Sequence, residues 1–114
     1  MHELPLTRQI VRIVLDAAQK ENALRVIKVN LVLGESAGVV EDCVKTYYDL
    51  LAKGTVAEGA ALFTRAERVT LRCKRCDTEF LRAHFSFTCP DCGLEGTPTG
   101  KGHDCFVESV ELET

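Results

Sequence analysis

Four of the six cysteines lie in two short motifs that have the spacing of a metal site. The motifs are Cys73-Lys-Arg-Cys76 and Cys89-Pro-Asp-Cys92-Gly93, with twelve residues between them. Two sulfurs two residues apart can converge on one ion across a tight turn, and two such turns supply the four thiolates of a closed tetrahedral zinc site. Such a site has no open position for water. The sequence therefore predicts a structural Zn(II) bound by Cys73, Cys76, Cys89 and Cys92.

Two alternatives remain open for these cysteines, namely two disulfides or an iron site of the rubredoxin kind. Charged residues such as Arg8 and Arg12 interrupt the opening stretch of the chain, where a signal peptide would have roughly 7–15 apolar residues in a row. We therefore expect a cytoplasmic protein whose thiols stay reduced and whose paired cysteines bind metal. Cys43 and Cys105 lie outside the motifs, and we expect them to be buried, unreactive thiols.

The amino terminus offers a second candidate metal site. If Met1 is retained, its amine, the His2 amide nitrogen and the His2 imidazole can form adjoining chelate rings around one ion. Nitrogens held nearly in a plane suit Ni(II) or Cu(II). From the residues alone, a histidine at position 2 is usually accidental. His84 and His103 have no partner at ligand spacing, so we expect them to be surface or packing residues.

The positions of the apolar residues predict two helices and three strands around these motifs. Apolar residues recur at three- and four-residue steps in two segments, as they do on one face of a helix, and alternate in the others, as in a half-buried strand. We expect helices at residues 5–21 and 41–53 and strands at 25–33, 60–65 and 106–113. In the first helix Ile13 is expected on the buried face, and in the first strand Ile27.

The last strand follows the cysteine motifs, so the cysteine segment is predicted to be an insertion. We expect an α+β fold in which two helices pack on a small mixed sheet and a four-Cys zinc ribbon is inserted. The predicted domains are residues 1–68 plus 103–114 for the core and residues 69–102 for the zinc-binding part. Apolar runs are only a few residues long, so no segment is expected to span a membrane.

Two other functional classes can be weighed from the sequence. Residues 65–84 carry six Lys or Arg against three Asp or Glu, which makes a zinc-ribbon nucleic-acid-binding module the alternative hypothesis. The formal net charge of −3 and the absence of Trp oppose it. The stretch from Gly96 to Gly102 superficially resembles a phosphate loop, but Glu95 and Gly102 depart from that motif. We therefore expect neither nucleic-acid binding nor enzymatic activity.

Several stretches together resemble the HypA/HybF family of nickel metallochaperones for [NiFe]-hydrogenase maturation. They are the opening Met1-His-Glu-Leu4, the strand from Val26 to Glu35, the connection from Gly54 to Gly59, the paired cysteine motifs, and the closing segment from Val107 to Glu113. The resemblance covers nearly the whole chain in order. Many members also have a histidine beside their cysteine pairs, whereas this chain has Lys74, Arg75 and Gly93 there.

The resemblance implies that Ni(II) is a transferable cargo bound at Met1, His2 and Glu3, with Glu3 either supporting the site or contacting a partner. It also implies structural zinc at the four motif cysteines. The implied partners are the nickel GTPase HypB and the [NiFe]-hydrogenase large-subunit precursor, and some members also serve urease. The implied role is that of a non-enzymatic nickel carrier.

Overall fold

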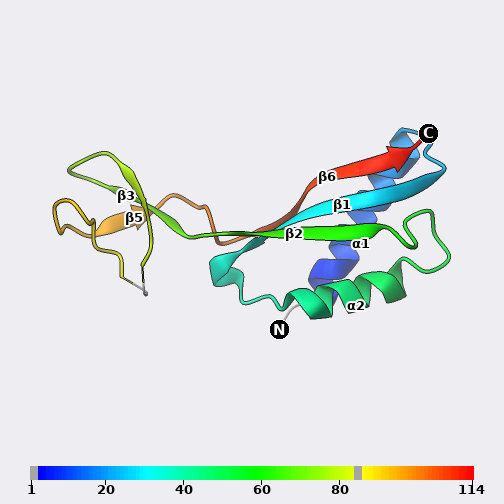
Figure 1. Cartoon of the computed structure of the whole chain (residues 1–114), viewed down its shortest axis with the longest axis horizontal. Coiled ribbons are helices and arrows are strands. Elements are labelled where there is room, and N and C mark those ends of the chain that lie inside the picture. The colour runs from blue at the N-terminus through cyan, green and yellow to red at the C-terminus, as the bar shows by residue number, and fades with distance from the viewer. Residues whose placement is uncertain (1–2, 84–85) are drawn as a thin grey trace.

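The computed structural model describes residues 3–83 and 86–114, and its two lobes lie end to end. The chain measures 54 × 27 × 17 Å, and its radius of gyration is 17.4 Å, against about 13 Å for a compact domain of this length. Figure 1 shows the larger lobe, with both helices, joined to a smaller lobe by a narrow waist. Their elements, in chain order, are α1 (Glu3–Lys20), β1 (Arg25–Gly34), the 3₁₀ turn η1 (Glu35–Ala37), α2 (Glu41–Leu51), β2 (Ala61–Glu67), β3 (Thr70–Cys73), β4 (Glu79–Leu81), β5 (Gly96–Pro98) and β6 (Cys105–Glu113).

The larger lobe contains a mixed three-stranded sheet in the order β2-β1-β6. The central strand β1 pairs with β2 in parallel and with β6 in the antiparallel direction. Antiparallel strands can be neighbours without a crossover, but a parallel pair needs a long connection, which the segment containing α2 supplies. The fold class is the expected α+β arrangement of a mixed sheet with two helices.

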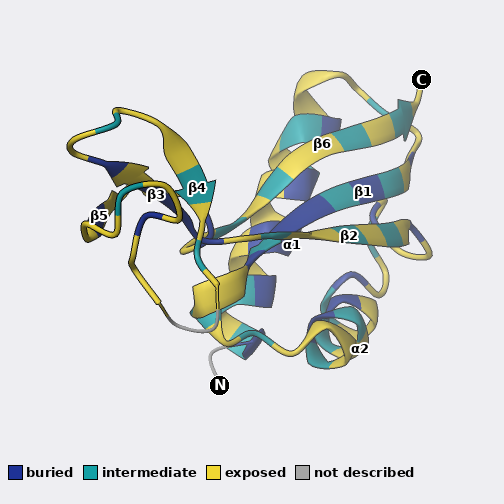
Figure 2. Cartoon of the chain, turned by 60° about the vertical axis from the view of Figure 1, so that its left-hand side comes forward, coloured by how far each residue is buried: buried dark blue, intermediate teal, exposed yellow. Residues whose placement is uncertain are grey.

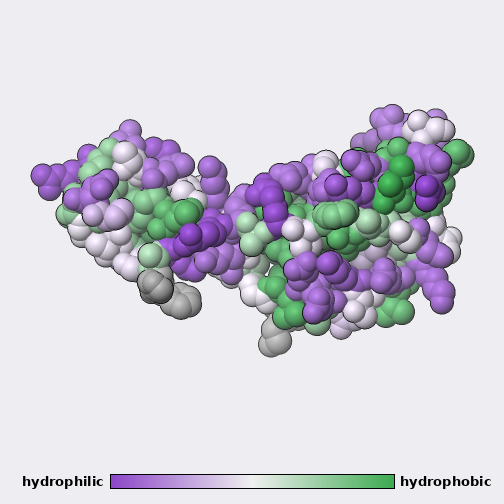
Figure 3. All heavy atoms as spheres, viewed as in Figure 1, coloured by the Kyte–Doolittle hydropathy of each residue, from purple (hydrophilic) through white to green (hydrophobic). Residues whose placement is uncertain are grey.

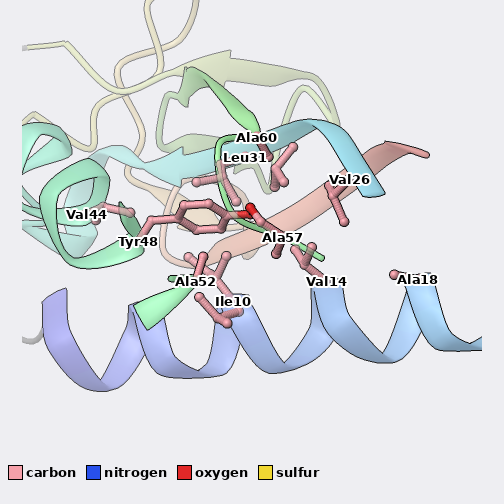
Figure 4. Packing of buried hydrophobic residues seen from close by; sticks show 12 residues of the cluster. Ile10, Val14, Ala18, Val26, Leu31, Val44, Tyr48, Ala52, Ala57 and Ala60 are labelled. Carbon is pink, nitrogen blue, oxygen red and sulfur yellow. The ribbon is translucent and has the colours of Figure 1, made fainter. Parts of the chain in front are cut away.

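The core of the larger lobe lies between the sheet and the helices (Figure 4). Tyr48 of α2 is fully buried, and its ring lies among side chains of α1, α2 and β1. Its hydroxyl donates a hydrogen bond of 3.0 Å to the carbonyl oxygen of Ala57. The phenol therefore fills the core while its polar atom is satisfied, as a buried tyrosine requires. Figure 2 shows the same division, with buried residues along β1 and on the inner sides of the helices.

Two side chains expected in the core lie at the surface. Ile27 is 41% exposed, whereas its neighbour Val26 is buried. The pairing of β1 with β6 shifts register between Val26 and Lys28, and such a bulge reverses the alternation of faces along the strand. Ile13 is 44% exposed because Ile10 and Val14 already occupy the part of α1 that faces the sheet.

The smaller lobe contains the second sheet, in the order β4-β3-β5. Its strands are three or four residues long, and its buried apolar side chains are few, chiefly Val69 and Leu71. Gly96 of β5 pairs with Cys73, and a Cβ at Gly96 would lie 2.6 Å from the ring of Phe80. Gly96 thus lies in a strand against an aromatic ring rather than in a phosphate loop. So small a core needs a further constraint to fold.

Candidate metal centre and its junction with the amino-terminal lobe

The two cysteine motifs form two turns with the same backbone hydrogen bonds. In the first turn the N–H of Asp77 donates to the carbonyl of Cys73 (2.9 Å), and in the second the N–H of Gly93 donates to that of Cys89 (3.0 Å). Asp77 and Gly93 are the residues directly after the second cysteine of each motif, and both have a positive φ, 54° and 78°. Asp and Gly are among the residues that tolerate this conformation. Each turn therefore brings its two sulfurs to one side.

The four sulfurs converge as a tetrahedral metal site requires. The Sγ atoms of the motif cysteines all lie within 4.8 Å of one another, and those of Cys73 and Cys92 are 3.4 Å apart. Four sulfurs at about 2.3 Å from a zinc ion would be separated by about 3.8 Å. Cys73 and Cys89 are buried, and Cys76 and Cys92 are partly buried. The donor set and its spacing fit a closed four-thiolate site.

The thiols of this cluster differ in acidity. The pKa of Cys73 is lowered to about 7, chiefly because the backbone N–H of Cys76 donates to its sulfur at 3.4 Å. The pKa of Cys76 is raised to about 12, first by hydrogen bonding with Cys92 and then with Cys73. Since thiolates are the metal ligands, a cation must displace the remaining protons. Metal binding here should release protons and weaken as the pH falls.

At the amino terminus, Met1 and His2 lie outside the described residues, and Glu3 is the first residue of α1. Glu3 is only 8% exposed, and its Oε2 accepts a hydrogen bond of 3.0 Å from the backbone N–H of Val40. Val40 is the N-cap of α2, so one carboxylate joins the beginnings of both helices. Of the three residues expected to bind nickel, Glu3 is therefore the one that the structure describes.

Where the lobes meet, backbone segments from both approach closely. A Cβ at Gly102 would lie 2.5 Å from the nitrogen of Val69, and a Cβ at Gly34 would lie 2.7 Å from the Gly102 carbonyl oxygen. Two carboxylates cap this junction. Glu35 accepts the N–H of Val69 at 2.8 Å, and Glu67 accepts the N–H of Gly102 at 3.0 Å. Sequence analysis missed this junction, because its contacts join residues more than thirty positions apart.

His103, which is expected to be a surface or packing residue, is paired with Ser36. Its Nδ1 lies 2.6 Å from Oγ of Ser36, and that hydroxyl also donates to the carbonyl of Gly102 at 3.0 Å. Because a hydroxyl has one proton, the network assigns the Nδ1–H as the donor to Ser36. A general base would have to accept from the hydroxyl instead. The pair therefore ties η1 to the loop before β6. His84 lies outside the described residues.

The remaining cysteines are more accessible than expected. Cys43 lies on α2 and Cys105 at the start of β6, as predicted, but both are only partly buried. On α2 the buried positions are taken by Val44 and Tyr48, and no residue of β6 is fully buried. The structure does not place either cysteine in the four-sulfur cluster.

Most basic side chains of residues 65–84 are engaged within the chain. Arg72 lies 3.0 Å from Glu79, Arg65 2.6 Å from Glu108, and Arg82 3.7 Å from Glu35. The pKa of Arg65 is raised, chiefly by its hydrogen bonds to Glu108. A basic stretch in the sequence is therefore divided among acidic partners on both lobes. Figure 3 shows hydrophilic side chains over much of the waist.

The chain is similar to nickel-incorporation proteins along nearly its whole length. A family model described as "Hydrogenase/urease nickel incorporation, metallochaperone, hypA" matches residues 1–112. The hydrogenase maturation factor HypA of Caldanaerobacter subterraneus subsp. tengcongensis is 40% identical over 114 residues, covering 99% of this chain and all of the other. That of Dehalococcoides mccartyi strain 195 is 34% identical over 113 residues, covering 99% and 95%.

Two solved structures have the same fold. The solution structure of the Ni metallochaperone HypA from Helicobacter pylori superposes with a TM-score of 0.72 at 22% identity, covering 99% of this chain and 98% of the other. A second structure, a solution structure of HypA protein, gives a TM-score of 0.75 at 23% identity, covering 98% and 96%. Among the described residues, neither helix has the length and apolar character that a membrane-spanning segment needs.

Proposed function

We propose that this chain, which belongs to the HypA family, is a nickel metallochaperone that binds Ni(II) at its amino terminus and delivers it during maturation of [NiFe]-hydrogenase. The observation that supports the proposal most strongly is the match of the nickel-incorporation family model from residue 1 to residue 112. The match includes the terminal Met-His-Glu as well as the four cysteines. If the match left out this terminus, the fold and the four cysteines would support only a zinc-ribbon protein.

The proposed nickel site uses the Met1 amine, the His2 amide nitrogen and the His2 imidazole, with Met1 as the mature terminus. Such a set of nitrogens near one plane suits Ni(II). Glu3 is proposed to support this site rather than to contact a partner, because its carboxylate is largely buried and holds the N–H of Val40. Nickel bound at a chain end leaves coordination positions that an acceptor can enter before the donor leaves.

The four-cysteine cluster is proposed to hold a structural Zn(II). Zinc would link the two turns, and its binding free energy would contribute to folding of a lobe with little core of its own. We propose that residues 69–102 form this zinc-binding unit and that residues 1–68 with 103–114 form the nickel-binding unit. The bound zinc supplies a crosslink and no reaction chemistry.

The chain is proposed to act in the cytoplasm as a carrier without catalytic activity. Its proposed partners are the nickel GTPase HypB, which would supply any nucleotide hydrolysis, and the [NiFe]-hydrogenase large-subunit precursor that receives the metal. Urease accessory proteins are a further proposed destination. The described residues offer no arrangement in which His103 could activate Ser36, since the serine hydroxyl is already donated to Gly102.

Nickel titration of three zinc-loaded proteins tests the proposal. They are the wild type with its native terminus, His2→Ala, and a version with one residue added before Met1. We expect tight binding only in the wild type, because the added residue moves the amine out of the chelate and His2→Ala removes the imidazole. Equal affinity in all three proteins would contradict a terminal site.

A further inference from the structure

An open groove runs along α1 on the side next to α2. Ile10 and Val14 point from α1 into the core (Figure 4). Val11 and Leu15 each follow one of these residues, so they lie about 100° further around the helix. There they meet Leu51 of α2 across a hollow of about 430 Å³. The residues that line this hollow are Arg8, Val11, Arg12, Leu15, Asp16 and Leu51.

A second hollow, of about 390 Å³, extends the groove towards the end of α1. Leu15 lines both hollows, and the second one also contains Gln19 of α1 and Val56 from the connection between α2 and β2. From Arg8 to Gln19 the helix rises about 16 Å, which is the length of roughly three helical turns. Small-molecule sites enclose most of their ligand, whereas this groove is open to solvent. Its shape suits the apolar face of a docked helix.

The groove is positive at one end only. Arg8 and Arg12 are exposed and lie one turn apart on the same side of α1. Within residues 3–83 and 86–114, neither arginine has an ion pair or a side-chain hydrogen bond, in contrast to Arg65 and Arg72. The first hollow contains one acidic residue, Asp16, and no described residue that lines the second hollow is charged. Two unpaired guanidinium groups therefore stand beside an apolar floor.

The apolar floor is still accessible in the folded chain. Val56 is 40% exposed, and Leu15 and Leu51 are only partly buried although they pack against the core. A helix laid in the groove would cover these side chains, and its own acidic side chains would pair with the arginines. A second copy of this chain fits less well, because two copies facing groove to groove would bring their arginines together.

We propose that this groove binds an amphipathic helix of a partner protein. The apolar side chains of that helix lie on Leu15, Leu51 and Val56, and its acidic side chains lie over Arg8 and Arg12. The position of the arginines also sets a direction, since the acidic end of the bound helix must lie towards the beginning of α1. This inference does not depend on the proposed nickel site, so either can fail without the other.

Two designed peptides of about sixteen residues, held helical by a side-chain crosslink, probe the groove of the full, zinc-loaded chain. Both carry leucines at steps of three and four residues. One has glutamates at one end, and the other has lysines in their place. Backbone amide spectra of the chain locate the binding site. We expect the glutamate peptide to shift amides of α1 and those near Leu51 and Val56, and the lysine peptide to bind about tenfold more weakly.

Arg12→Glu and Lys20→Glu are a matched pair of variants. Both residues are exposed on α1 and lack an ion pair among the described residues, but Lys20 lines a different hollow, beside β6. Arg12→Glu should weaken binding of the glutamate peptide by about tenfold, because an exposed attraction becomes a repulsion. It should also bind the lysine peptide more tightly than the wild type does. Lys20→Glu should change either affinity by less than about twofold.

Equal binding of the two peptides would overturn the proposal, as would amide shifts confined to the sheet or the absence of any binding. Two other occupants would also overturn it. A wild-type dimer in sedimentation velocity that Arg12→Glu dissociates would assign the groove to a second copy of the chain. Binding to phosphatidylglycerol vesicles that is lost in Arg12→Glu, without peptide binding, would assign the arginines to an anionic lipid surface.

Discussion

At the scale of single residues, two glycines near the junction between the lobes differ in the space available for a side chain. Gly102 has a φ of 89° and a backbone neighbour where a Cβ would be, whereas Gly100, two residues earlier, has a φ of 98° and open space. The first residue is constrained by both conformation and packing, and the second by conformation alone. Comparing them isolates the close approach to Val69.

Replacing Gly102 by alanine should lower the free energy of unfolding by about 3 kcal/mol, because left-handed strain adds to a backbone clash. Gly100→Ala should cost about 1 kcal/mol, from strain only. Urea unfolding of both zinc-loaded variants measures the difference. Equal losses in the two proteins would show that the junction relaxes to admit a methyl group.

Tyr48 makes a second residue-scale prediction, for alkaline pH. Burial first, and the charge of Asp49 second, raise the pKa of its phenol from 10.0 to about 12. A raised pKa means that the neutral form stabilises the fold fully below pH 10, and that this contribution is lost as the pH rises from 10 towards 12. Unfolding free energies of the wild type should therefore fall relative to Tyr48→Phe by at most about 1.4 kcal/mol per pH unit in that range.

Measurement of both proteins between pH 9 and pH 11 cancels the titration of their shared groups. Below pH 10 the phenylalanine variant should be the less stable by about 1 kcal/mol, because the Ala57 carbonyl loses its donor. A difference that stays constant with pH would mean that Tyr48 ionises freely in the folded protein.

At the scale of elements, hydrophobic periodicity predicted both helices and the three strands of the larger sheet to within about two residues. It failed at Ile27, because the β-bulge between Val26 and Lys28 arises from pairing with β6 and is not visible within residues 25–33. The cysteine spacing correctly predicted convergence of four sulfurs. The tie between Ser36 and His103 could not be predicted, since it joins residues 67 positions apart.

The two metal turns allow a matched exchange at the positive-φ position. Asp77→Gly removes left-handed strain from the first turn and loses only an exposed ion pair with Arg72, so zinc affinity should stay equal or rise by about twofold. Gly93→Asp places a side chain at the corresponding position of the second turn and should lower zinc affinity by about fivefold. Competition with a chromogenic chelator measures both. The account of the turns would be wrong if Asp77→Gly weakened zinc binding as much as Gly93→Asp.

At the scale of the whole molecule, the two proposed metal sites lie on different lobes, and hydrogen bonds hold the two lobes together at their junction. The four-cysteine cluster lies in the smaller lobe, and Glu3 lies at the end of α1 in the larger one. Sequence motifs predicted both sites, but the junction between the lobes could not be predicted, because its carboxylate to backbone contacts join residues more than thirty positions apart. The ion pairs of Arg65 with Glu108 and of Arg72 with Glu79 engage part of the basic stretch that suggested nucleic-acid binding.

The central claim is that one chain holds a tightly bound zinc and a separate, exchangeable nickel. Metal analysis of untagged protein with a native terminus, after incubation with excess of both metals and removal of the unbound ions, tests it directly. The account predicts about one zinc and one nickel per chain, loss of nickel alone in His2→Ala, and loss of zinc alone in Cys89→Ser at saturating nickel. Nickel that persists in His2→Ala and leaves with the cysteine substitution would contradict it.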